Sequence, residues 1–145
     1  MPSDRTFKAM NALHRGLLKV SRGRVGGRAK KMPVLELVTT GRRTGERRSV
    51  MLTSPYQEGS TLVVVASRGG DDQHPAWYLN VLAHGDVDVV MEGRSRPMHA
   101  HAATAEERAR LWPIVTGRQP HYAGYQRKTA REIPLVVLAP EHAPG

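Results

Sequence analysis

Residues 34–67 read VLELVTTGRRTGERRSVMLTSPYQEGSTLVVVAS, and this stretch decides the fold. Two short turns, GRRTG and EGS, interrupt it, and both contain glycine. The last apolar run is continuous, which is typical of a strand buried on both faces. Apolar runs joined by such turns form hairpins. The sequence therefore predicts three antiparallel strands, Val34–Thr40, Arg47–Gln57 and Thr61–Ser67.

Further along the chain, strand and helix patterns alternate. Thr104 and Glu107 form a capping box that starts a helix, and we expect Pro113 to kink or end it. The other predicted helices are Ala76–Ala83 and His121–Glu132, and the other strands are Val87–Glu92, Ser95–Ala103 and Ile133–Pro140. Successive hairpins with late helices predict an α+β, mainly antiparallel sheet, closed into a small barrel with flanking helices.

The charge of the chain is concentrated at one end. Of a formal net charge of +9 over 145 residues, residues 1–31 carry nine lysines and arginines against one acid. The rest is near neutral, which argues against a nucleic-acid-binding fold. We expect a basic N-terminal helix and linker over residues 1–31 and a cofactor-binding domain over 32–145. The chain has no cysteine, so disulfides and thiolate chemistry are excluded.

An apolar stripe marks the N-terminal segment as an amphipathic helix. Its residues are Phe7, Met10, Leu13, Leu17 and Leu18. One interpretation packs this helix on its own domain, and the other rests residues 5–20 on an anionic membrane surface. The N-terminus lacks the apolar core of a secretory signal. We expect a cytoplasmic protein, with the inner face of the cell membrane as the alternative location.

Two glycine-containing stretches predict an anion site. GRRTGERR places Arg42, Arg43, Arg47 and Arg48 around one turn, and guanidinium groups match phosphate and carboxylate oxygens. The alternative is a charged turn that serves solubility. SRGG, residues 67–70, adds a second wall at the end of a buried strand, because glycine lets backbone approach a ligand. Asp71 and Asp72 oppose an anion there, and we expect them to cap the following helix or to face solvent.

Aromatic side chains follow these stretches, but no motif for covalent or metal catalysis does. Trp77 lies early in the helix after Pro75, and Tyr122 and Tyr125 share one helix face. Tyrosines at a pocket stack on planar rings and offer a proton. The histidines show no familiar metal-ligand spacing. An enzyme with this sequence would rely on a bound organic cofactor.

Taken in order, four segments resemble one known family. They are LVTTGRRTGERRSV, LVVVASRGGDDQHPAWYLNVLA, EERARLWP and HYAGYQ…REIPLVVLAP. Together they resemble the deazaflavin-dependent nitroreductases, subgroup A of the flavin/deazaflavin oxidoreductases, over Pro33 to Pro140. The resemblance implies a split β-barrel of the FMN-binding type. It also implies coenzyme F420, whose phosphate and poly-glutamate tail would meet the arginines.

The resemblance assigns roles residue by residue. For the cofactor it implies Arg42, Arg43, Arg48, Ser67, Arg68, Gly69, Gly70 and Trp77. For the substrate it implies Thr53, Trp77, Tyr122 and Tyr125, and the proton donors would be Ser67 and Tyr125. Arg43 and Arg68 stand where the best-known member has lysine, and Thr53 and Gln119 stand where it has tyrosine.

The implied reaction is hydride transfer from reduced F420 to a planar, electron-poor acceptor. The acceptors implied are quinones, nitroaromatics and conjugated lactones or enones such as coumarin-type compounds. Two alternatives stay open: an FMN-binding split-barrel oxidoreductase, and a non-catalytic protein that carries F420 or contacts the membrane. The expected partners are a small-molecule substrate and, as in other split barrels, a second copy of the chain.

Overall fold

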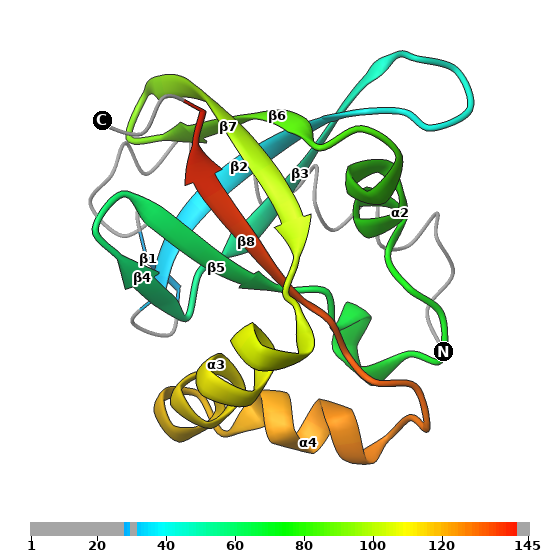
Figure 1. Cartoon of the computed structure of the whole chain (residues 1–145), viewed down its shortest axis with the longest axis vertical. Helices are drawn as coiled ribbons and strands as arrows, with labels where there is room; N and C mark the ends of the chain where they lie inside the picture. Colours follow the sequence, from blue (N-terminus) through cyan, green and yellow to red (C-terminus); the bar gives the residue numbers. More distant parts are fainter. Residues whose placement is uncertain (1–27, 30–31, 142–145) are drawn as a thin grey trace.

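The computed structural model describes residues 28–29 and 32–141, which form a curled antiparallel sheet with helices against it (Figure 1). The sheet follows the order β1-β2-β6-β7-β8-β5-β4, and β3 pairs with β2. The strands are β1 (Arg28–Ala29), β2 (Met32–Thr40), β3 (Arg47–Thr53), β4 (Tyr56–Glu58), β5 (Thr61–Val65), β6 (Asp86–Met91), β7 (Arg94–Ala102) and β8 (Leu135–Pro140). The predicted α+β split β-barrel is confirmed.

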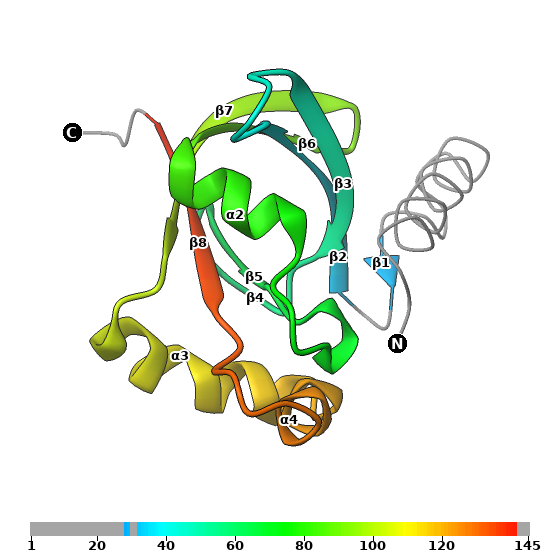
Figure 2. The ribbon, with the colours of Figure 1, turned by 90° about the vertical axis from the view of Figure 1, so that its right-hand side faces the viewer.

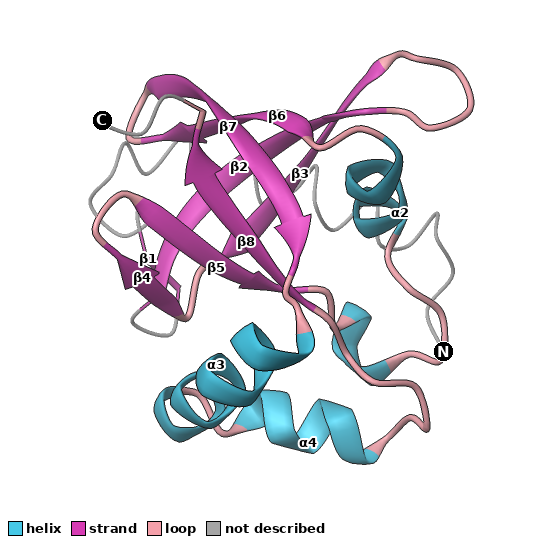
Figure 3. Cartoon of the chain, in the orientation of Figure 1, coloured by secondary structure: helices cyan, strands magenta, loops and turns pink. Residues whose placement is uncertain are grey.

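Helices cover one side and one end of this sheet. They are the short 3₁₀ turn η1 (Arg68–Gly70), α2 (Ala76–Ala83), α3 (Ala105–Arg118) and α4 (His121–Arg127). Figure 2 shows α2 across the open side of the curled sheet, and α3 and α4 together below its end. Figure 3 separates the strands from the helices in the first view.

Two apolar cores explain why β5 is continuously apolar. Leu62 and Val64 pack inside the barrel with α2, whereas Val63 and Val65 pack against α3 and α4. Successive residues of a strand point to opposite faces, so a strand between two cores needs no polar face. Each buried valine or leucine contributes about 1.5–3 kcal/mol relative to an exposed one. The predicted two-sided burial of this strand is confirmed.

The barrel is open along β3. Within the described residues this strand pairs only with β2, from Val34↔Thr53 to Thr40↔Arg47, and its other edge faces β5, η1 and α2. All of β3 is exposed or half-buried. An unpaired strand edge offers backbone N–H and C=O groups to a ligand. This opening is where the site lies.

The predicted strand Arg47–Gln57 is wrong as a single element. It ends at Thr53, and a separate strand begins at Tyr56. Pro55 has no N–H for a ladder, and the hydroxyl of the fully buried Ser54 lies 2.8 Å from the Val63 carbonyl oxygen. The chain therefore turns here, between β3, which pairs with β2, and β4, which pairs with β5.

Pro113 was predicted to kink or end its helix. It does not end the helix, because α3 continues to Arg118. Leu111 and Val115, on either side of the proline, are buried in the same core. Their packing holds both turns in place although Pro113 donates no hydrogen bond. By contrast, α4 is shorter than expected and ends at Arg127.

The N-terminal helix lies outside the described residues, and its boundary with the domain stays a prediction. Of the segment taken as helix and linker, only Arg28 and Ala29 are described, and they pair with Pro33 and Met32. Among the described residues, none of the helices has the length and apolar character needed to cross a membrane.

Candidate active site

A groove of about 800 Å³ follows the open edge of β3. The turn between β2 and β3, the strand β3, the start of η1 and the first turn of α2 line it. The lining residues are Thr39, Gly41, Arg42, Arg43, Thr44, Arg47, Arg48, Ser49, Val50, Met51, Leu52, Val65, Ser67, Arg68, Gly69, Pro75, Ala76, Trp77 and Asn80. The groove thus runs from a basic turn to an apolar interior.

The basic end exposes guanidinium groups on a braced turn. Gly41 N–H donates to the Glu46 carbonyl at 2.7 Å, and Gly45 N–H donates to the Gly41 carbonyl at 2.9 Å. Arg47 is engaged, since it pairs with Asp88 and donates to Thr40 Oγ1 at 2.8 Å. Arg42, Arg43 and Arg48 are exposed on the same turn, and Arg48 has an acid nearby, Glu46 at 3.3 Å.

The second wall is the loop after β5. Ser67 is buried, and η1 follows with positive φ at Arg68 (46°), Gly69 (64°) and Gly70 (88°). The Arg68 side chain is buried beside Asp71, with Nε 3.5 Å from the carboxylate, and it also donates to Gln73 Oε1 at 3.2 Å. Asp71 therefore neither caps α2 nor faces solvent, because it compensates the charge of Arg68.

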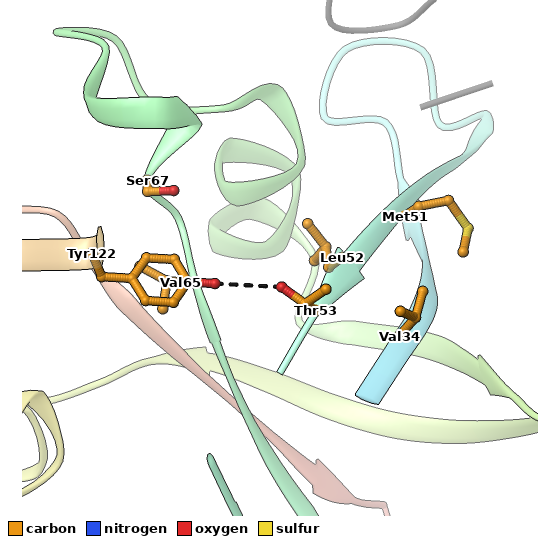
Figure 4. Close-up of a pocket in the computed structure, with 7 residues that line it drawn as sticks. All are labelled: Val34, Met51, Leu52, Thr53, Val65, Ser67 and Tyr122. Atoms are coloured by element: carbon orange, nitrogen blue, oxygen red, sulfur yellow. Dashed lines mark hydrogen bonds between the residues drawn. The ribbon is translucent and has the colours of Figure 1, made fainter. Parts of the chain in front are cut away.

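A smaller pocket of about 200 Å³ opens from the inner end of the groove (Figure 4). It shares Met51, Leu52, Val65 and Ser67 with the groove and adds Val34, Thr53 and Tyr122. The Tyr122 hydroxyl points toward Thr53, with its oxygen 3.4 Å from Thr53 Oγ1. Burial raises the pKa of Tyr122, and the hydrogen bond with Thr53 opposes this. Tyr122 is therefore protonated at neutral pH.

Comparison with known proteins decides the class. The family model of the F420H(2)-dependent quinone reductases matches residues 12–140. The chain belongs to the F420H(2)-dependent quinone reductase family. An F420H(2)-dependent quinone reductase of Mycobacterium tuberculosis is 36% identical over 133 residues, which are 87% of each chain. The predicted enzyme class, an oxidoreductase, and the predicted cofactor, F420, are confirmed at the level of the family.

Solved structures agree with the fold. The structure of an F420-H2 dependent reductase (FDR-A) is 37% identical to this F420H(2)-dependent quinone reductase family member, with a TM-score of 0.65. The match covers 73% of this chain and 93% of that one. A domain-swapped dimer is 31% identical, with a TM-score of 0.67, and the match covers 90% of this chain and 98% of that one.

Most of the residues that the sequence resemblance implied for the site of this quinone reductase family member line one of the two cavities. Arg42, Arg43, Arg48, Ser67, Arg68, Gly69 and Trp77 line the groove, and Thr53, Ser67 and Tyr122 line the small pocket. Gly70 and Tyr125 line neither. Gly70, at the end of η1, is buried against α4, and Tyr125 packs edge-on against Tyr122, with ring centres 6.0 Å apart.

Sequence reasoning missed Asn80, a buried side chain of α2 that also lines the groove. Asn80 Oδ1 accepts from Arg42 N–H at 3.1 Å, and its Nδ2 donates to Thr39 Oγ1 at 3.2 Å. It thereby fixes the arginine turn to α2. The one sequence signal for a role of Asn80 is its position in the middle of an otherwise apolar helix. The sequence pattern does not indicate which groups it would hydrogen-bond.

The residues present fit F420. Along β3, Arg48 and Thr53 are five residues apart, which spans roughly 16 Å at 3.3 Å per residue. An elongated ligand with a charged tail and a planar ring would thus meet arginines at one end and Ser67 and apolar side chains at the other. Gly69 leaves open space beside the groove, with no atom within 4 Å of where a Cβ would lie.

Proposed function

We propose that this protein is an F420H2-dependent reductase whose acceptors are planar and electron-poor. Quinones are the first class to test. Nitroaromatics and conjugated lactones or enones, including coumarin-type compounds, are the further classes. The roles assigned below to individual residues are part of the proposal.

The observation that carries the proposal is the continuity between the groove and the small pocket. Ser67 and Leu52 line both cavities, so ligands in the two cavities would lie against each other. Hydride transfer needs such contact, and positioning is most of what a hydride donor requires. The small pocket has mainly apolar walls with three hydroxyl groups, from Thr53, Ser67 and Tyr122, which suits a flat ring bearing an oxygen acceptor.

The chain would contribute binding, orientation and a proton. Reduced F420, when bound, supplies the hydride. Arg42, Arg43 and Arg48 would hold the phosphate and tail through charge-assisted hydrogen bonds. Hydroxyl groups at the pocket, from Ser67 and Tyr122, would donate a proton to the acceptor oxygen. One hydride and one proton together would convert a quinone to its hydroquinone, in which both carbonyl groups have become hydroxyls, and reduced F420 would be oxidised by two electrons, so the reduction is balanced.

A paired titration with F420 and FMN tests this function. Binding is followed by fluorescence, and the protein with reduced F420 is then mixed with a soluble quinone. We expect F420 binding and quinone-dependent reoxidation. Binding of FMN alone would overturn the cofactor, and F420 binding without reoxidation by any of the acceptor classes would favour the carrier alternative.

Replacing Arg48 by alanine should weaken F420 binding about tenfold, the loss typical of one charge-assisted hydrogen bond. Turnover at saturating F420 should fall much less, because Arg48 lies away from the small pocket. Arg94→Ala is the matched control, since it removes an exposed arginine outside the groove lining. If the F420 titration curves of Arg48→Ala and of the unaltered protein coincide, Arg48 is not part of the cofactor site.

Tyr122→Phe should lower turnover with quinone about tenfold or more while F420 affinity stays unchanged. The raised pKa of Tyr122 keeps its proton on as the pH rises, so this group should cause no loss of turnover between about pH 7 and 9. The family resemblance implies Ser67 and Tyr125 as donors, and Tyr125 packs edge-on against Tyr122 without lining either cavity. Tyr125→Phe is therefore the direct comparison, and a larger loss in Tyr125→Phe would reassign the donor.

Two expectations about partners also belong to the proposal. We propose a homodimer, which light scattering would find at twice the chain mass of 16.0 kDa. Contact of residues 5–20 with membrane stays a sequence-based prediction. Co-sedimentation with anionic vesicles, with and without residues 1–31, tests it.

A further inference from the structure

The Arg131 side chain is hydrogen-bonded to the loop that carries Ser67. This residue lies between α4 and β8 and lines neither cavity. Its Nε donates to the Asp71 carbonyl at 2.8 Å, its Nη2 to the Ser67 carbonyl at 2.9 Å, and its Nη1 to the Ala66 carbonyl at 3.3 Å. One guanidinium thus holds both ends of the loop.

The backbone conformation of this loop needs stabilising contacts from residues outside the loop. Arg68, Gly69 and Gly70 all have positive φ, and Arg68 is not a glycine. Such a run is disfavoured for the isolated chain and persists only when the surroundings determine it. Inside the loop, the backbone bonds are Gly70 N–H to the Ser67 carbonyl at 2.9 Å and Asp71 N–H to the Arg68 carbonyl at 3.1 Å. Arg131 adds three charge-assisted bonds to these.

Arg131 is itself fixed to the helix that carries Tyr122. Gln126 of α4 donates from Nε2 to the Arg131 carbonyl at 2.7 Å, and its Oε1 accepts from Ile133 N–H at 2.9 Å. The backbone of Arg131 is therefore tied to α4, whereas its side chain is tied to the Ser67 loop. These two elements supply neighbouring parts of the small pocket, Tyr122 and Ser67, on the side that faces β3 (Figure 4).

We propose that Arg131 is a positioning residue that sets the placement of Ser67 relative to Tyr122 in the wall of the small pocket. The placement of Ser67 bears on catalysis only if the proposed function holds. Arg131 touches neither cavity, so its effect is on geometry. Lysine cannot replace it, because a single ammonium group cannot span three carbonyl oxygens in the fixed arrangement of a guanidinium.

Hydrogen exchange of the protein without cofactor gives the first test. In Arg131→Gln, the amides of Gly70 and Asp71 should exchange about tenfold faster or more, because the loop opens more often. Arg131→Lys should fall between this variant and the unaltered protein. Arg127→Gln is the matched control, because it removes an exposed arginine from the end of α4, a few residues from Arg131.

Kinetics give the second test. In Arg131→Gln, kcat/KM for quinone should fall roughly 30-fold, since a displacement near 1 Å is enough for a loss of this order. F420 affinity should fall only about threefold, because the arginine turn is untouched. In Arg131→Ala, added methylguanidinium should restore part of the activity, and equal ionic strength of sodium chloride should not.

The outcomes separate the two proposals. Unchanged exchange at Gly70 and Asp71 in both Arg131 variants, or the same change in Arg127→Gln, would overturn the positioning role. If Arg131→Gln does not fold, Arg131→Lys and the exchange data decide. If the unaltered protein binds no F420, the proposed function fails. Exchange in the cofactor-free protein still decides whether Arg131 holds the loop.

Discussion

Replacing Gly70 by alanine should destabilise the protein by about 3 kcal/mol or more, through a positive φ and a clash together. Its φ is +88°, and a Cβ there would lie 2.8 Å from the Tyr125 carbonyl oxygen and 3.1 Å from Lys128 Cβ. Backbone atoms of α4 cannot move aside without losing the core around Tyr122. Urea denaturation of the purified variant measures this loss.

Gly69→Ala is the control that separates strain from contact. Gly69 also has positive φ, +64°, but a Cβ added there would meet no atom within 4 Å. Its alanine variant should therefore lose only about 1 kcal/mol, the cost of the left-handed backbone alone. Because Gly69 lines the groove and Gly70 does not, Gly69→Ala should weaken F420 binding more than its stability loss suggests. Equal stability losses in the two variants would show that η1 is not packed tightly on α4.

Local signals predicted much of the fold. The alternation and apolar runs of β2, β5 and β8 follow directly from the two cores on either side of the sheet. The capping box at Thr104 is present, with Glu107 N–H donating to Thr104 Oγ1 at 3.1 Å. The two errors came from tertiary packing. It kept the helix intact beyond Pro113, where the sequence allowed an end, and it ended the strand before Pro55, where the sequence predicted none.

The site was predictable where its residues are neighbours in sequence. Arg42, Arg43 and Arg48 gather because they lie in or beside one hairpin turn, and the local excess of bases over Glu46 favoured an anion site over a turn that serves solubility. The supports of the site come from far along the chain. Asn80 meets Arg42 across 38 residues, and Arg131 meets Ser67 across 64. Nothing in a local pattern says which backbone group a distant polar side chain will bind.

Asn80→Leu should cost about 2–3 kcal/mol of stability, because the buried Thr39 hydroxyl loses its donor and the Arg42 N–H loses its acceptor, and the hydroxyl keeps a bond of 3.5 Å to the Arg48 carbonyl. Asn80 is 6% exposed, and Thr39, to which it donates, is 1% exposed. Leucine branches at Cγ as asparagine does and leaves no cavity, and its larger volume adds a packing cost to the loss of the hydrogen bonds. Leu82→Asn on the same helix is the control, because Leu82 is 55% exposed and the reverse exchange there should cost about 0.5 kcal/mol.

The same variant tests whether the arginine turn must be held in place to bind F420. Without Asn80, the N–H of Arg42 loses its anchor to α2, and the turn keeps its own bonds, among them those of Gly41, Gly45 and Thr44. F420 affinity should then fall about tenfold, since the arginines would have to be ordered on binding. A titration beside that of Leu82→Asn measures this. If stability falls and affinity does not, the turn binds the anion without being held, and the arginines act by charge alone.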